Sequence, residues 1–160
     1  MALRFENSMI PPALREYGRT AAGNMYTMTK DNGGMTLDLA TLSPASHSEG
    51  FYVGGASNYA GQQIESVTTP IEGFTRAFCE FNLGYAYAEQ LQRNAAGQGT
   101  GEPVNTLIGT WVNDGIVYVD IVNHITDRFD AITQGFIRNE KAIWDIANNK
   151  AIHTFDVIAV

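Results

Sequence analysis

The sequence predicts an α+β protein with a mixed or mainly antiparallel sheet and two main helices, about 70–93 and 127–139, packed on one face. Three observations support this class. Short segments of the last third carry alternating or continuous apolar residues, which is typical of strands. Two longer segments repeat apolar residues at helical spacing. The order strand, strand, helix, strand, strand favours helices grouped on one face of a sheet.

Length and composition favour a single folded domain. The chain has 160 residues and is 44% hydrophobic, so we expect one domain over residues 1–160. The small polar stretch at about 95–103 is a candidate flexible loop. Division there would leave about 60 residues, which is marginal for an independent domain.

The charge balance restricts the classes of partner. The chain has 10 basic and 17 acidic residues, a formal net charge of −7. Direct nucleic-acid binding is therefore disfavoured, because it requires clustered Lys and Arg. No apolar run reaches the length of a membrane span, and the first residues do not resemble a signal peptide. We expect a cytoplasmic protein.

The first third of the chain predicts short strands and a turn. Residues 25–29, Met-Tyr-Thr-Met-Thr, have the composition of a strand. Asn32-Gly33-Gly34 is typical of a turn, because Asn and Gly accept positive φ. Residues 35–39 alternate between apolar and polar side chains. We therefore expect a hairpin over residues 25–40.

A glycine pair follows the next predicted strand. Phe51-Tyr52-Val53 predicts a strand that ends at Gly54-Gly55. Such a pair is typical of a turn or bulge, and close approach of the backbone to a ligand is the alternative. No complete glycine-rich phosphate loop is present.

A capping pattern predicts the start of the first long helix. Thr69 and Glu72 match a capping box, and Pro70 suits the first helical position. The predicted apolar stripe of this helix is Phe74, Phe78, Phe81, Tyr85 and Ala88. Cys79, the only cysteine, lies within this segment, and we expect it to be buried.

The last third of the chain has the clearest strand pattern. Residues 107–112 and 116–122 predict two strands joined by the tight turn Asn113-Asp114-Gly115. The second strand is apolar at nearly every residue except Asp120, which is typical of a central strand. Residues 142–146 predict a third strand, and residues 151–157 a fourth.

A second helix is predicted between these strands. Thr126 or Asp127 is the expected cap, and Asp127 and Asp130 suit the positive N-terminal end of a helix. Phe129, Ile132 and Phe136 are predicted to form its inner face.

Few residues indicate catalysis. His124 lies between Asp120 and Asp127, so a metal site or a His–Asp pair is one interpretation. Asp120 and Asp145, on predicted neighbouring strands, are a second candidate pair. Ordinary surface or capping roles are the favoured interpretation of both sets. We therefore predict no catalytic residue, no cofactor and no metal site.

Several segments resemble a recurring pattern in small uncharacterised proteins of bacteriophages and mobile elements. The segments are 34–38, 50–55, 109–120, 126–131 and 139–146. The acidic character and the strand Ala142-Ile-Trp-Asp-Ile146 are also similar to anti-restriction proteins that mimic DNA. The resemblance implies an accessory gene product that acts in the host cytoplasm.

Charge and resemblance together predict a non-catalytic inhibitor of a host defence complex, of the anti-CRISPR or anti-restriction type. Its acidic surface would bind a nucleic-acid-binding protein complex by stoichiometric contact. The predicted partner-binding residues are Asp114, Asp127, Asp130, Glu140 and Tyr59. The alternatives are a minor virion or assembly protein, and a small ligand-binding protein or enzyme that uses Gly54-Gly55. The apolar strand 116–122 and the apolar C-terminus also predict a homodimer.

Overall fold

The computed structural model describes residues 12–56, 66–96 and 107–158. The helices of this part are α1 (Pro12–Asn32), α2 (Arg76–Ala96), α3 (Arg128–Ile137) and α4 (Thr154–Ile158), with a 3₁₀ turn, η2 (Ile71–Gly73). The strands are β1 (Gly34–Asp38), β2 (Ser43–Pro44), β3 (Phe51–Val53), β4 (Val67–Pro70), β5 (Leu107–Asn113), β6 (Ile116–Ile125), β7 (Ala142–Asp145) and β8 (Lys150–His153). The predicted α+β class is confirmed.

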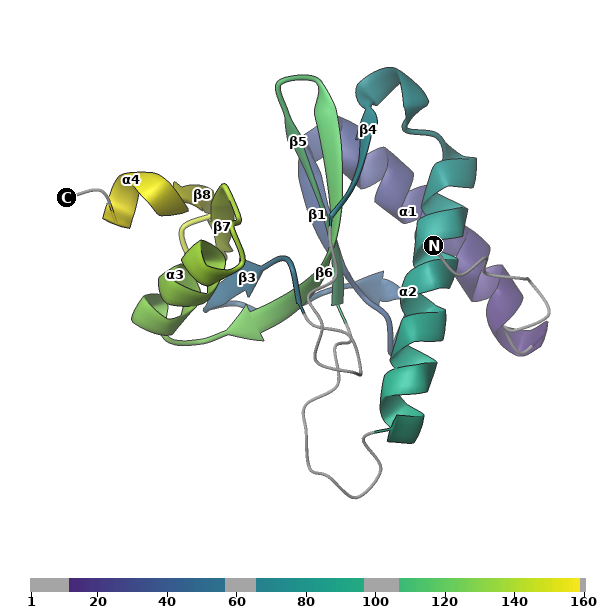
Figure 1. The fold of residues 1–160 in the computed structure, drawn as a ribbon. Helices are drawn as coiled ribbons and strands as arrows, with labels where there is room; N and C mark the ends of the chain where they lie inside the picture. Colours follow the sequence, from purple (N-terminus) through teal and green to yellow (C-terminus); the bar gives the residue numbers. More distant parts are fainter. Residues whose placement is uncertain (1–11, 57–65, 97–106, 159–160) are drawn as a thin grey trace.

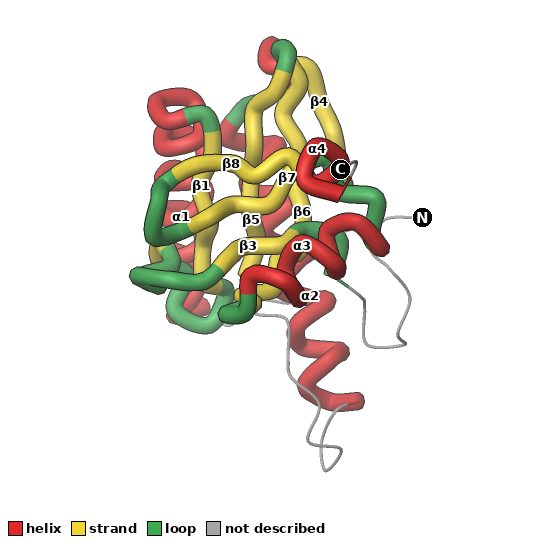
Figure 2. The backbone as a smooth tube through the Cα atoms, turned by 90° about the vertical axis from the view of Figure 1, so that its left-hand side faces the viewer, coloured by secondary structure: helices red, strands yellow, loops and turns green. Residues whose placement is uncertain are grey.

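The eight strands form one curled antiparallel sheet in the order β2-β1-β5-β6-β3-β7-β8, with β4 also paired to β6. Strand β6 is the shared element. One edge of β6 pairs with β5, while its other edge pairs first with β4 and then with β3. The sheet therefore has a large half with α1 and α2 and a small half with α3 and α4 (Figure 1). Figure 2 shows the strands of the small half crossing in front of those of the large half.

All helices lie on the same face of the curled sheet, as predicted. On β6, Val117, Val119 and Ile121 are buried in the core under α1 and α2. Ile125, on the same face because side chains alternate along a strand, packs against the core under α3. The helices consequently cover the convex face of the sheet. The opposite, concave face carries no helix and borders the space between the two halves.

Helix α1 replaces part of the predicted hairpin. The prediction of a strand at 25–29 and a hairpin over 25–40 was wrong, because these residues continue α1 as far as Asn32. Ala21, Met25 and Thr29 are fully buried at four-residue spacing. The Thr29 hydroxyl is 2.6 Å from the Thr110 hydroxyl of β5. Packing on the sheet therefore outweighs the strand-like composition of this segment.

Helix α2 begins later than predicted. The capping box at Thr69 and Glu72 was wrong, because Thr69 and Pro70 belong to β4 and pair with β6. The helix instead begins at Arg76, where the hydroxyl of Thr75 accepts a hydrogen bond from the backbone N–H of Phe78 at 3.2 Å.

The buried face of α2 also differs from the predicted stripe. Phe74 and Cys79 are buried as expected, together with Leu83. Phe81 was predicted to be core but is 42% exposed. Burial raises the pKa of the Cys79 thiol to about 12. The thiol therefore stays protonated and unreactive at neutral pH.

The C-terminal elements follow the prediction closely, with two exceptions. The turn between β5 and β6 forms with positive φ at Asp114 and Gly115, as its sequence predicts. The predicted strand at 151–157 ends at His153, because Thr154 starts α4. The Thr154 hydroxyl donates to the carbonyl oxygen of Glu140 at 2.8 Å, which fixes this change of direction.

The second exception is the inner face of α3. Asp127 caps α3 as predicted, and its side chain accepts a hydrogen bond from the N–H of Asp130. The predicted inner face was wrong at its two phenylalanines, since Phe129 is 77% and Phe136 45% exposed. The buried residues are Ala131 and Gly135. Small residues on this face let the helix lie close to the sheet.

Candidate functional site on the concave face

A cleft of about 770 Å³ lies on the concave face between the two halves of the sheet. Its residues come from β1, β5 and β6 on one wall and from β7 and β8 on the other. This volume falls within the roughly 300–1,000 Å³ typical of small-molecule sites. The strand register determines its lining, because Thr36, Gly109 and Asp120 are opposite one another on neighbouring strands and share the face that carries no helix.

Aromatic side chains stand on both walls of the cleft. Trp111 comes from β5, Trp144 from β7 and Tyr52 from β3. Trp111 also contacts Tyr118 of β6, with ring centroids 5.7 Å apart. The sequence contains two tryptophans, so both of them line this one cleft.

Two carboxyl groups, Asp120 and Glu140, line the cleft from opposite halves. The Ser66 hydroxyl donates a hydrogen bond to Oδ1 of Asp120. A Cβ at Gly54 would lie 2.9 Å from Cγ of Asp120, so glycine allows the end of β3 to pass against this carboxyl. The signal for this site in the sequence is the single acid, Asp120, in an otherwise apolar strand.

Burial raises the pKa of both carboxyl groups. For Asp120, hydrogen bonds from Ser66 and the backbone of Gly55 oppose this rise in pKa. For Glu140, burial and then the charge of Asp120 raise the pKa to about 7, while Arg138 opposes the shift. The pair can therefore hold a proton near neutral pH, which suits hydrogen bonding to a ligand as well as proton transfer.

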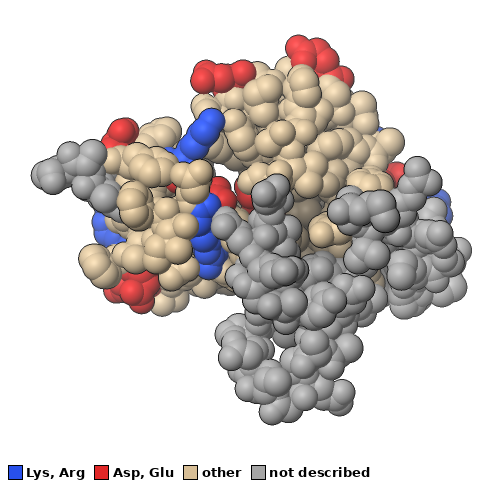
Figure 3. Space-filling view, viewed as in Figure 1, with Lys and Arg blue, Asp and Glu red and all other residues tan. Residues whose placement is uncertain are grey.

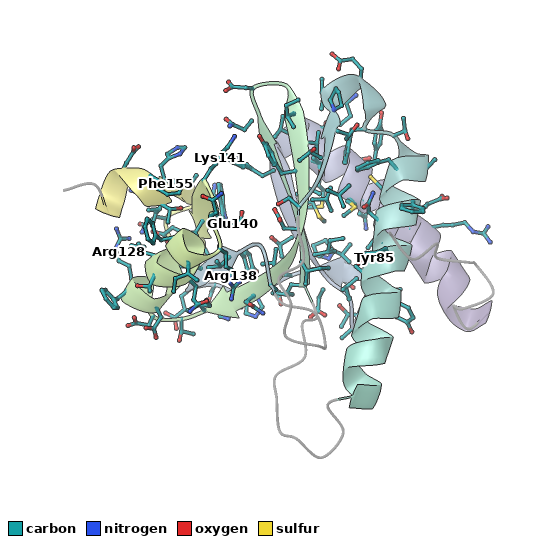
Figure 4. The ribbon with its side chains drawn as sticks, viewed as in Figure 1. Tyr85, Arg128, Arg138, Glu140, Lys141 and Phe155 are labelled. Atoms are coloured by element: carbon teal, nitrogen blue, oxygen red, sulfur yellow. The ribbon has the colours of Figure 1, made fainter. Side chains whose placement is uncertain are left out.

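Two basic side chains lie beside the carboxyl pair. Nη1 of Arg138 donates to the carbonyl oxygen of Gly54 at 3.1 Å, which ties α3 to the end of β3. Nζ of Lys141 donates to the hydroxyl of Tyr118 at 3.1 Å and so joins the two halves of the sheet. Figure 4 shows Glu140 and Lys141 on the side of the small half that faces the large half. In Figure 3, acidic and basic side chains meet in the hollow between the halves.

The structure excludes the alternative interpretation in which His124 pairs with an aspartate. His124 does not pair with Asp120 or Asp127, and its Nε2 lies 2.8 Å from the carbonyl oxygen of Glu49. Its ring stacks on His47, with centroids 3.9 Å apart. Burial and the neighbouring His124 lower the pKa of His47.

The alternative in which Asp120 pairs with Asp145 is excluded as well. Strand β3 separates β6 from β7, and Asp145 shares the helix-facing side of β7 with Ile143. Asp145 is buried and accepts a hydrogen bond from Nδ2 of Asn148 at 2.8 Å, which lowers its pKa. The partner of Asp120 across the cleft is Glu140, which no local sequence pattern indicates.

The predicted partner-binding residues occupy separate places. Asp114 is exposed at the tip of the β5–β6 hairpin, and Asp127 and Asp130 are exposed at the start of α3. The ten residues of β6 separate these two sites by roughly 30 Å. Glu140 lies in the cleft, and Tyr59 lies outside the described residues. The four described acids therefore do not share one surface.

A second exposed feature lies on the outside of the small half. Phe129, Phe136, Ile137 and Phe155 are all large, apolar and exposed. We call these four residues the α3–α4 surface. The rings of Phe136 and Phe155 contact each other, with centroids 5.6 Å apart. Exposed aromatic residues grouped in this way are typical of a protein-binding surface.

A scan of family models and searches of curated proteins and solved structures find no match to this chain. Within residues 12–56, 66–96 and 107–158, no group of three or more His, Cys, Asp or Glu side chains is placed to hold a metal ion. No helix of the same part is both long enough and apolar enough to cross a membrane.

Proposed function

We propose that the protein binds a small organic molecule in the cleft between the two halves of its sheet. The single observation that carries this proposal is a cleft of about 770 Å³ that combines aromatic walls with two partly buried carboxyl groups. Binding sites typically combine such apolar walls with a few converging polar groups. Gly54 lines the cleft, so the proposal develops the alternative of a ligand site at Gly54-Gly55.

Intrinsic fluorescence gives a direct test, since both tryptophans line the cleft. A library of small molecules is screened for compounds that change tryptophan emission and raise the melting temperature.

Ala142→Phe should block the cleft, because Ala142 lines it. Ala77→Phe, on the exposed side of α2, is the matched control. A true ligand binds wild type and the control but not the blocked variant. Compounds that bind all three equally would contradict the proposal.

The α3–α4 surface favours a second candidate function, stoichiometric inhibition of a host defence complex. Phe129 is exposed between Asp127 and Asp130, so an aromatic anchor is flanked by acidic residues. Interfaces often place aromatic residues at the centre and charged residues at the rim, where opposite charges on the partner speed association. Such an inhibitor would act in the host cytoplasm without catalysis.

Capture from host lysate tests this second function. Phe129→Ala and the double variant Asp127→Lys, Asp130→Lys should each weaken capture of a partner. Phe81→Ala, which removes an exposed ring from the other half, should leave capture unchanged. Equal capture by all variants would remove the α3–α4 surface from the proposal.

Light scattering tests the predicted homodimer separately. The α3–α4 surface is its candidate interface, since closed two-fold pairs are the commonest oligomers. Phe129→Ala should then shift the mass from two chains toward one. A single-chain mass for wild type at every concentration would contradict the dimer, and very large assemblies would favour a virion component.

A further inference from the structure

The charged groups around the cleft nearly cancel. Asp120 and Glu140 supply two carboxyl groups, and Arg138 and Lys141 supply two positive charges beside them. A strongly charged ligand, such as a phosphate or a polyamine, would meet repulsion as well as attraction. Among the described residues, this balance favours a neutral ligand.

The polar groups are nevertheless ready to accept hydrogen bonds. The carboxyl of Glu140 lines the cleft, and the nearby positive charge of Arg138 favours its ionised form, in which it only accepts hydrogen bonds. Asp120 accepts two hydrogen bonds, one from the Ser66 hydroxyl on Oδ1 and one from the backbone of Gly55. A carboxylate offers about four acceptor positions. Several hydroxyl groups of one ligand can therefore bind to this pair.

The tryptophans supply a different kind of contact. The face of an indole ring is electron-rich, so it attracts the weakly positive C–H groups of a saturated ring. Trp111 and Trp144 stand on opposite walls of the cleft, and the carboxyl pair lies on the same concave face. A ligand with hydroxyl groups at its edges and C–H groups on its faces would satisfy both features.

The geometry points to a neutral saccharide as the ligand of the cleft. The inference rests on the proposed function, because it names the class of molecule that the cleft binds. Trp144 and Trp111 stack on the sugar rings, and Glu140 and Asp120 accept hydrogen bonds from the hydroxyl groups. Three observations together support this inference: the cleft volume, the aromatic walls and the charge balance. The two acids by themselves would not support it.

A panel of probes distinguishes the saccharide from other classes. Maltose, cellobiose and diacetylchitobiose are titrated against the full chain by tryptophan emission and calorimetry. Tyramine and agmatine serve as cationic probes, and guanosine and adenosine as planar ones. At least one disaccharide should saturate the signal, and its affinity should change by less than about threefold between pH 6 and pH 8.

Two variants separate stacking from charge. Trp144→Ala should lower saccharide affinity at least tenfold, while Trp144→Tyr should retain it within a few-fold and show that the fold is intact. Glu140→Gln keeps a hydrogen-bonding group without the charge, so it should lower saccharide affinity only a few-fold. Glu72→Gln, at an exposed acid of η2, is the control and should have no effect.

The possible outcomes have different consequences. Binding of an amine that strengthens as Glu140 ionises, and that Glu140→Gln abolishes, would overturn the saccharide and leave a ligand-binding cleft. Binding of a nucleoside alone would do the same. Saccharide binding that Trp144→Ala leaves unchanged would place the sugar elsewhere and overturn the inference. If no compound of this panel or of the wider library binds, both the inference and the proposed function fail.

Discussion

The two halves of the sheet differ in how far they bury the apolar side chains of their helices. In the large half, α1 and α2 cover a core that includes Phe74, Met25 and Leu37. In the small half, the core comprises Phe51, Val53, Ala131, Ile143 and Ile152, with Ile132 of α3 packed against it, while the four residues of the α3–α4 surface are exposed. The large half therefore supplies most of the stability, and the small half carries exposed groups that are available for binding. The cleft lies where the two meet.

The largest effect should come from the core of the large half. Phe74 is buried and packs against Tyr26 and Phe78. Phe74→Ala should cost about 3–5 kcal/mol, because it removes a buried ring and leaves a cavity. Urea unfolding measures this change. A loss below about 1 kcal/mol would show that the large half is not the main source of stability.

A smaller effect is expected where α3 packs on the small half. A Cβ at Gly135 would lie 2.8 Å from Cγ2 of Ile143. Gly135→Ala should therefore destabilise by about 1–3 kcal/mol through overpacking, partly offset by about 1 kcal/mol of helix propensity. Gly23→Ala is the matched control in α1, where the nearest atom is the flexible Arg76 guanidinium at 3.6 Å. Hydrogen exchange should show faster opening of α3 and α4 in the Gly135 variant only.

The junction between the halves should make stability depend on pH. Glu140 titrates near pH 7 in the folded protein, above its ordinary value of 4.5. The folded state then holds the extra proton between these values, so stability should fall as pH rises from about 4.5 to 7 and then level off. Solvent screens this partly exposed group, so the fall should be about 1–2 kcal/mol.

Glu140→Gln isolates this contribution. The variant should lose that part of the pH dependence and be more stable than wild type above pH 7. The contribution of Asp120, whose pKa is also raised, should remain. Unfolding curves at a series of pH values measure both effects. A variant with the same pH profile as wild type would contradict the assigned role of Glu140.

The smallest effects are expected at the exposed rings. Phe129→Ala and Phe81→Ala remove side chains that are 77% and 42% exposed. Each should change the free energy of unfolding by less than about 1 kcal/mol. If Phe129→Ala lowered the free energy of unfolding by more than this, and only at high protein concentration, a second chain would be shown to cover the α3–α4 surface.

The sequence correctly predicted a turn and a helix cap that depend only on residues close together in the chain. The β5–β6 hairpin forms because Asp114 and Gly115 accept the positive φ of its turn. Asp127 caps α3 because its carboxylate reaches the N–H of Asp130 in the next turn. The grouping of helices on one face likewise follows from the alternation of side chains along β6.

The sequence alone did not identify α1, the inner face of α3 or the partner of Asp120. Each depends on packing between distant segments. Residues 25–29 are helical because they pack on β5, and the small residues of α3 face the sheet because a close approach requires them. Asp120 was visible as the one acid in an apolar strand, but Glu140 reaches it only through the curl of the sheet. Long-range curvature leaves no local pattern, so only the tertiary structure could assemble the cleft.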